Sequence, residues 1–541
     1  MGYSEAYCHL CGVSFNICRA RDAGEGELAT YSSSDGLYGD IEDVDLGKCA
    51  ENACMFALRN QQAEEDDVAS DPDYEPPESD DDYEPCEYDS DYESGDAMSL
   101  CDDEEDDEET TNEQEVYREF LVGTLRHFRR ETGEPVGAIV YSPEMRKKDT
   151  LIPITSDEFP EGYEPEDLEH MPSRTCSEAL AYHGSAISLL EMRGCRTAQF
   201  LVHKGSAKGT WQPDGLHESW ETTEDWFLSG VSDGMESRDC GFPTVWPARG
   251  GLEFVHADNV NFDPRHIASN DIAMPFHPWC FDIFSRQSKV HFGKVNVDGL
   301  MKWRNAESDY NAFNSFPRSR DVFEAQEQWW NHSPGKEYLA ANPLYVPGLP
   351  AMLFGASQDA TSMDYAKTAA QPPGDRTDRL SSLPLEVYLH IISFLESADI
   401  TSLRATSKAF THLPNGVWYR FVRVEMPWLW EAWDENELEH TPSWWATVTA
   451  NEVKYVKDMR ERYREVLKGE DMPSHPAVDY LFPWPSASAD EIRLPRATTD
   501  WHRVYTQIKS NWGRLKGLRN RQRIWEDVEE VMRRIKKYDT Q

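Results

Sequence analysis

Residues 380–422 read LSSLPLEVYLHIISFLESADITSLRATSKAFTHLPNGVWYRFV, and they are the most informative stretch of this 541-residue chain. Pro384 suits a first helical turn because its missing N–H would be unpaired there, and Glu386 favours the same turn electrostatically. The apolar residues that follow form two faces, one of Leu385, Tyr388, Leu389, Ile392 and Leu395 and the other of Val387, Ile391 and Phe394. A helix that is apolar on two sides needs two packing partners. We therefore expect one face to close a small core and the other to be left for a partner protein.

Two further short helices are predicted after this one. Ser397 or Asp399 can cap the next helix. Residues 407–413 supply another short helix before Trp418. The stretch is thus a compact helical module.

This module resembles the F-box family, whose sequence opens with Leu-Pro-x-Glu and continues through Ile-x-x-Phe-Leu, Asp-Ile/Leu, Ser-Lys and an aromatic residue. The matching positions are Leu383, Pro384, Glu386, Ile391, Phe394, Leu395, Asp399, Ile400, Leu403, Ser407, Lys408, Phe410 and Trp418. Phe410 stands where many members have Trp, which should mainly change core volume. The resemblance implies docking on the Skp adaptor of a Skp/cullin/F-box ubiquitin ligase. It also implies which residues lie at or beside that interface: Pro384, Leu385, Ile391, Ile392 and Leu395.

Four tracts outside this module extend the resemblance to a group of filamentous-fungal F-box proteins with an N-terminal CxxC-containing region. They are residues 8–16, 187–204, 275–284 and 337–349. This group resemblance implies a layout, with the CxxC-containing region before the F-box, but no known chemistry.

The charge of the chain is concentrated in one tract. The formal net charge is −46, and residues 64–115 contain 27 Asp or Glu and no Lys or Arg, which leaves −46 + 27 = −19 for the rest. Such a tract cannot bury enough apolar surface to offset chain entropy, so we predict disorder there. An acidic chain repels nucleic-acid phosphates and anionic lipid, so no nucleic-acid partner and no membrane partner is expected. The sequence has no signal peptide and no long apolar run, which predicts a cytoplasmic or nuclear protein.

Composition and periodicity predict an α+β fold in six units. Residues 116–353 mix short apolar strands with helical segments, and residues 501–538 keep one apolar stripe that predicts a single long helix with a basic opposite face. The predicted units are a zinc-knuckle-like segment at 1–59, the acidic tract at 60–115, the α+β domain at 116–353, a linker at 354–379, the F-box at 380–425 and a Trp-rich helical region at 426–541.

A zinc site is predicted from Cys8 and Cys11, which stand in the CHLCG form of a zinc knuckle. His277 and Cys280 are the preferred second pair, because Pro278 can open a helix and ligands three residues apart at a helix start point the same way. Together they would form a treble-clef-like Cys3His site with one structural zinc. Two rival second pairs stay open, Cys176 with Cys195 and Cys49 with Cys54.

No catalytic motif emerges from the sequence. Residues 230–234 fit the G-x-S-x-G pattern around Ser232, but the next residues do not read as the helix that a hydrolase elbow needs. We therefore expect no catalytic residues and a non-enzymatic subunit. The leading interpretation is a ligase substrate receptor that holds an unidentified client protein, and the alternative is a scaffold or nuclear regulator that uses its acidic tract and F-box for protein interactions.

Overall fold

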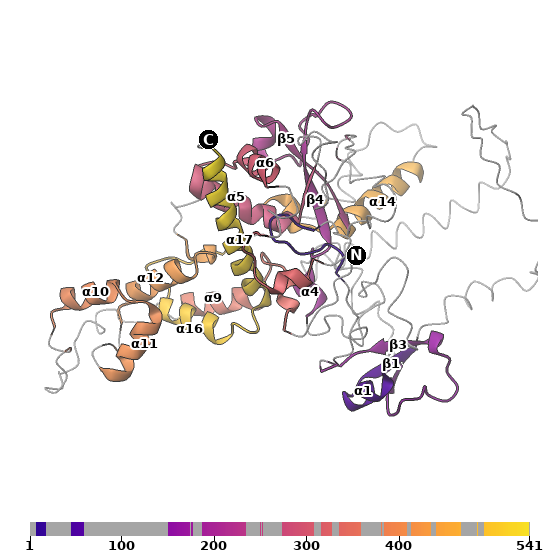
Figure 1. The fold of residues 1–541 in the computed structure, drawn as a ribbon, viewed down its shortest axis with the longest axis horizontal. Coiled ribbons are helices and arrows are strands. Elements are labelled where there is room, and N and C mark those ends of the chain that lie inside the picture. The colour runs from indigo at the N-terminus through magenta and orange to yellow at the C-terminus, as the bar shows by residue number, and fades with distance from the viewer. Residues whose placement is uncertain are drawn as a thin grey trace, which may run out of the picture.

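The structure is a computed structural model of the 541-residue chain. It describes residues 7–17, 45–58, 150–173, 175–176, 187–233, 249, 252, 273–307, 315–326, 335–358, 380, 383–407, 410, 413–433, 440–466, 484 and 492–539. The predicted disordered tract at 60–115 lies outside these residues. Figure 1 shows a central body, with the helices of the predicted F-box at one end and a small sheet module at another.

A three-stranded antiparallel sheet forms the centre of the body. Its order is β5 (Trp226–Asp233), β4 (Thr197–His203) and β6 (Met274–Phe276). The central strand β4 reads TAQFLVH and is buried along almost its whole length. Burial of successive residues, whose side chains point to opposite faces, is typical of a strand covered on both faces.

Three helices pack together on this body. The C-terminal helix α17 (Lys516–Asp539) contacts both α5 (Pro278–Phe292) and α6 (Val297–Ala306), and α5 contacts β4. The prediction of one helix over 501–538 was wrong, because α16 (Trp501–Ser510) and α17 are separate helices with a turn at 511–514 between them. The predicted apolar stripe is nevertheless buried at Trp501, Val504, Ile508 and Leu518.

The remaining helices belong to the body and to the predicted F-box, and they range from 3 to 17 residues in length. They are α4 (Leu189–Met192), η6 (Ser219–Thr222), α8 (Asp321–Glu324), η9 (Glu337–Ala340), α9 (Leu349–Gln358), α10 (Leu385–Ser393), α11 (Ser397–Thr406), α12 (Asn415–Glu425), η13 (Trp430–Ala432), α13 (Trp444–Thr447) and α14 (Ala450–Val466). Helix α9 extends into the predicted linker, so residues 354–358 are helical rather than irregular.

A separate small module contains α1 (Leu46–Glu51), β1 (Met55–Leu58), β2 (Leu151–Pro153), η5 (Pro165–Asp167) and β3 (Leu168–Met171). Its strands form an antiparallel sheet in the order β2-β1-β3. Its buried residues form a hydrophobic cluster distinct from that of the body.

The α+β fold class is confirmed by these sheets and helices. The main hydrophobic cluster runs from Cys8 to Ile535 and includes Tyr388 and Ile392 of the predicted F-box. The domain boundaries stay predictions, but the core packs across those at 354–379 and 426. No helix in the described parts of the chain is both long and apolar enough to cross a bilayer.

Candidate functional site

The CHLCG segment forms a tight hairpin at the N-terminal end of the described chain. Tyr7 and Ser14 pair as an antiparallel bridge, and the Cys8 N–H donates to the Val13 carbonyl at 3.0 Å. Gly12 has a φ of +76°, a conformation that favours glycine, and its N–H donates to the Cys8 carbonyl at 2.7 Å. This turn brings the two knuckle thiols to the same side.

The preferred second pair opens α5 as predicted. His277 is the N-cap residue, Pro278 stands in the first turn, and the Cys280 N–H donates to the His277 carbonyl at 2.8 Å. One ligand atom from each of Cys8, Cys11, His277 and Cys280 lies within 4.8 Å of the other three, and all four residues are buried. The structure therefore assembles a Cys/His cluster that can hold a metal ion.

A hydrogen bond orients the imidazole in this cluster. The Nε2 atom of His277 lies 2.9 Å from the Cys195 carbonyl oxygen, which can only accept, so Nε2 carries the proton. Nδ1 is thereby left with its lone pair on the thiol side, 3.5 Å from Cys11 Sγ. Metal-binding histidines are commonly oriented by such a hydrogen bond from their other ring nitrogen.

The surroundings also favour a thiolate in the cluster. Burial opposes ionisation of Cys11, but hydrogen bonds from the Cys280 and Cys8 thiols outweigh it and lower the pKa of Cys11 well below its usual value. The Arg523 guanidinium donates to the Cys11 carbonyl at 2.7 Å, which brings a positive charge next to the cluster. A buried thiolate is the form that binds a metal ion.

The structure places the cysteines of the two rival second pairs elsewhere. Neither rival pair joins Cys8 and Cys11. Cys49 and Cys54 instead meet Cys176 and His170 in a second cluster, and among the described residues Cys195 belongs to neither cluster. Sequence reasoning missed His170, although its position six residues before Cys176 is a signal for a ligand pair.

The first predicted F-box helix has the two faces that the sequence indicates. Tyr388 and Ile392 are buried on one side, whereas Val387 and Phe394 are exposed by 44% and 75% on the other. Leu389, which the sequence grouped with Tyr388 and Ile392, is 36% exposed and does not share their burial. Phe410 is buried and stacks on Tyr388 with ring centroids 4.8 Å apart, so it fills the small core as expected.

The predicted adaptor-binding residues differ in exposure. Pro384 is exposed, Ile391 and Leu395 are partly buried, and Ile392 is only 1% exposed. The Leu385 side chain lies outside the described residues. Ile392 therefore belongs to the core and can act at an interface only by supporting its neighbours. The assignment of the others to an interface stays a prediction.

The three helices are fixed to one another and to the body. Arg420 of α12 donates to the Ile392 and Leu395 carbonyls at 2.8 and 3.0 Å, which satisfies groups that the end of α10 leaves open. Trp418 of α12 contacts Tyr505 of α16 with ring centroids 5.5 Å apart. Glu425 accepts from the Tyr505 hydroxyl at 2.7 Å, so polar contacts join the same two helices.

A comparison with family models matches residues 380–417 to the family described as "F-box domain". The chain contains an F-box domain. F-box domains typically bind a Skp-type adaptor and through it a cullin, and they are in general non-catalytic. The matched range ends within α12, whose Arg420 bonds the end of α10 and whose Trp418 contacts α16 of the body.

A comparison with curated proteins finds a 56-residue segment that is 50% identical to "ATP-dependent RNA helicase mss116, mitochondrial" of Aspergillus oryzae (strain ATCC 42149 / RIB 40). The segment covers 10% of this chain and 9% of that protein, so the likeness is confined to a short piece of each. No solved structure matches the chain.

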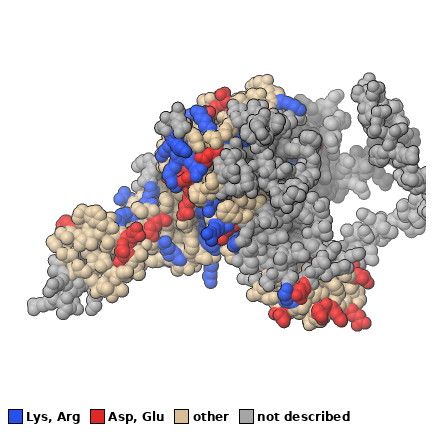
Figure 2. All heavy atoms as spheres, viewed as in Figure 1, with Lys and Arg blue, Asp and Glu red and all other residues tan. Residues whose placement is uncertain are grey.

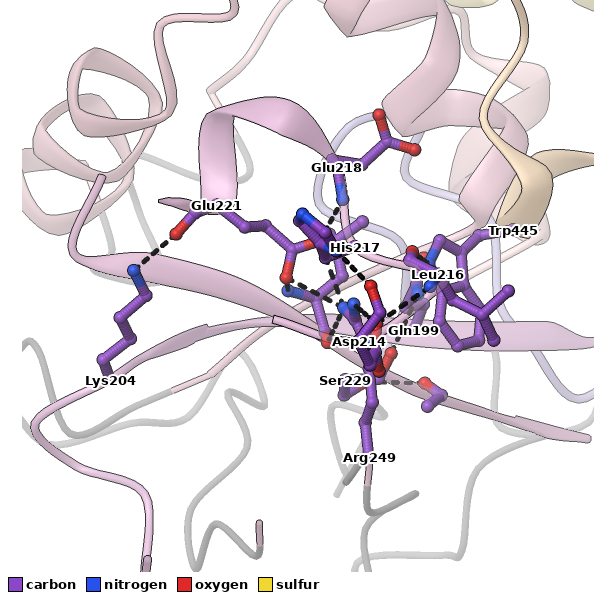
Figure 3. A network of polar contacts seen from close by, with 12 residues as sticks. Gln199, Lys204, Asp214, Leu216, His217, Glu218, Glu221, Ser229, Arg249 and Trp445 are labelled. Carbon is purple, nitrogen blue, oxygen red and sulfur yellow. Dashed lines mark hydrogen bonds and ion pairs between the residues drawn. The ribbon is translucent and has the colours of Figure 1, made fainter. Parts of the chain in front are cut away.

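A network of buried charges beside β4 and β5 also has the residue types of an active site (Figure 3). Arg249 donates to both carboxylate oxygens of Glu221 at 3.1 and 2.8 Å and to Asp214 Oδ1 at 2.6 Å. Burial raises the pKa of Glu221. Each of these charges has a partner, which is the pattern of a structural network. Residues 230–233 lie within β5, so Ser232 stands in a strand and not at the strand-to-helix turn of a hydrolase, and Gly234 lies outside the described residues.

Proposed function

We propose that this chain is a substrate-receptor subunit of a Skp/cullin/F-box ubiquitin ligase, without an active site of its own. The observation that carries the proposal is an F-box domain whose first helix leaves an apolar face in solvent. The F-box binds the adaptor, and the α+β body presents a client protein. The proposal implies work in the cytoplasm or the nucleus.

The adaptor surface centres on the exposed face of α10. Phe394 is 75% exposed and Val387 is 44% exposed, and Ile391 lies between them in sequence with a partly buried side chain. Large apolar side chains gathered on one helix face are typical of a docking site. Pro384 at the start of the same helix extends this face toward its N-terminus.

The attachment of the F-box supports the receptor role. The Arg521 side chain of α17 lies 2.9 Å from Glu431 and packs over Trp430 at 3.7 Å, and these two residues follow α12 closely in the chain. The Arg521 Nε atom also donates to the Pro343 carbonyl of the body at 2.6 Å. A rigid junction of this kind sets a fixed distance between adaptor and client, which a ligase needs to aim ubiquitin transfer.

The cluster of Cys8, Cys11, His277 and Cys280 is proposed to hold one structural zinc ion. Three thiols and one imidazole are a common ligand set for structural zinc. With its ligands buried and its histidine tautomer fixed, the ion would join the N-terminal hairpin to the start of α5. This role is structural, in keeping with a non-catalytic subunit.

The proposal is tested by pull-down of a purified Skp-type adaptor with the full chain. Phe394→Ala removes the exposed apolar side chain at the C-cap of α10 and is expected to weaken binding roughly thirtyfold, because truncation of a central interface anchor costs about 2 kcal/mol. Phe323→Ala is the matched control, since Phe323 is 45% exposed on α8 of the body. The control should bind like the wild type. Failure of the folded wild type to bind an adaptor at micromolar concentration would refute the ligase function.

The client role is tested separately by affinity purification with and without proteasome inhibition. Proteins that accumulate on inhibition and are still captured by the Phe394→Ala variant are expected for a receptor. If the F-box serves only the turnover of this chain itself, inhibition raises the level of the chain and enriches no captured protein. That result would favour the scaffold alternative.

A further inference from the structure

The small module has too little core to explain its own fold. Its buried cluster consists of Leu46, Cys49, Cys54, Phe56, Ile154, Leu168 and Cys176, so three of its seven members are cysteines. It is separate from the main cluster of the body. Domains with so few buried residues usually depend on disulfides or metal ions. The module's cysteines form no disulfide.

Its three cysteines and one histidine converge from different elements. Cys49 lies in α1, Cys54 directly precedes β1, His170 lies in β3 opposite Phe56, and Cys176 follows β3. One ligand atom from each lies within 4.8 Å of the other three. The Ser173 N–H donates to Cys54 Sγ at 3.4 Å, which is the kind of backbone contact that stabilises a thiolate.

The imidazole of His170 supplies a second, independent observation. Its Nε2 atom is buried and makes no hydrogen bond to any described residue. A buried nitrogen without a partner is costly unless something outside the protein satisfies it. We propose that Cys49, Cys54, His170 and Cys176 bind a structural zinc ion. Three thiolates and a neutral imidazole suit this borderline-soft ion better than they suit calcium or magnesium, which prefer oxygen ligands.

This ion would join two segments that are far apart in the sequence. The Leu58 N–H donates to the Thr150 carbonyl at 3.3 Å, so residues 59–149 leave and re-enter the module through one hydrogen-bonded pair. Cys49 and Cys54 lie before this segment, and His170 and Cys176 lie after it. A link between distant segments lowers the entropy of the unfolded chain, and its effect grows with the length of the closed loop.

The charge on the surface of the module argues against a nucleic-acid-binding role for this zinc site. Exposed carboxylates gather on it, as Figure 2 shows for the region of α1 and β3, and they include Asp45, Glu51, Asp157, Glu158, Glu161 and Glu164. Such a surface repels nucleic-acid phosphates, unlike that of a nucleic-acid-binding zinc finger. The proposed zinc site is therefore structural and is not part of a nucleic-acid-binding finger.

The test is the zinc content of the purified full chain, measured by mass spectrometry of the metal. Cys54→Ser and His170→Ala are each expected to contain one zinc ion fewer per chain than the wild type. Cys195→Ser and His203→Ala are the matched controls. Cys195 is a buried thiol outside both clusters, and His203 is a strand histidine whose Nδ1 is buried without a hydrogen bond to any described residue. Both controls should keep the wild-type content.

Two further variants keep the result clear if a change disturbs folding. His170→Cys retains four ligands and is expected to keep the wild-type zinc content, with a stronger thiolate-to-metal absorption after cobalt substitution. Cys11→Ser combined with Cys54→Ser should lose one ion more than Cys54→Ser alone, which separates this site from the N-terminal cluster. Equal zinc in the wild type, Cys54→Ser and His170→Ala would overturn the proposal, and so would iron in place of zinc.

Discussion

The two Cys/His clusters have the same ligand types but very different surroundings. The N-terminal hairpin that carries Cys8 and Cys11 is bonded to the body at several points, since the His9 N–H donates to the Pro275 carbonyl at 3.1 Å and the Ser14 N–H to the Ala325 carbonyl at 2.7 Å. The small module has its own cluster of seven buried residues. We therefore expect metal binding to be one support among many for the hairpin and the main support of the small module.

Metal removal should expose this difference most strongly. Chelation of the zinc-loaded full chain is expected to abolish amide protection in α1, β1, β2 and β3, because structural zinc contributes on the order of 10 kcal/mol to folding. The hairpin at 7–17 should lose only part of its protection, since its backbone bonds to the body remain. Hydrogen exchange followed by mass spectrometry measures both regions in one sample. An equal loss of amide protection in the two regions would show that the hairpin depends on its metal ion as much as the small module does.

Gly12→Ala tests how tightly the hairpin fits the body. A Cβ at Gly12 would lie 2.6 Å from Arg318 Nε, and its φ of +76° is costly for alanine. We expect the free energy of unfolding to fall by about 3 kcal/mol, from strain and crowding together. Urea denaturation of the full chain measures this change in the free energy of unfolding.

Gly335→Ala is the control for this change, because Gly335 has a φ of +89° but nothing within 4 Å of its Cβ position. It should lose only about 1 kcal/mol, the cost of the backbone conformation alone. Equal losses in the two variants would mean that the hairpin is not closely packed at Gly12.

Ala53→Gly, unlike the two glycine substitutions, is expected to stabilise the small module. Ala53 has a φ of 57° in the turn that leads to Cys54, a strained position that glycine adopts readily. Relief of this strain, less the entropy cost of glycine, should stabilise the module by about 0.5 kcal/mol. Hydrogen exchange of the β1 amides, measured at limiting zinc, should be slower in this variant than in the wild type. Faster exchange would show that the turn is not strained.

The outcome for individual residues shows where sequence reasoning is reliable. His277 and Cys280 were placed beside the knuckle because Pro278 opens a helix and the spacing is local, and the structure brings these four residues together. His170 was missed although Cys176 follows it by six residues, because its other partners, Cys49 and Cys54, lie on the far side of a long segment and no local pattern connects them. The break between α16 and α17 was missed because the apolar stripe continues through the turn.

The sequence by itself determined the α+β class, the F-box and the start of α5, because each depends on side-chain periodicity or a short fixed spacing. Only the tertiary structure decided between the preferred and the rival second pairs, brought Cys49, Cys54, His170 and Cys176 together, and showed which F-box residues face solvent. Strand pairing joins Phe56 to His170, and Arg521 of α17 joins Glu431 to Pro343. Contacts of this range depend on the packing of the whole chain, which a local pattern does not encode.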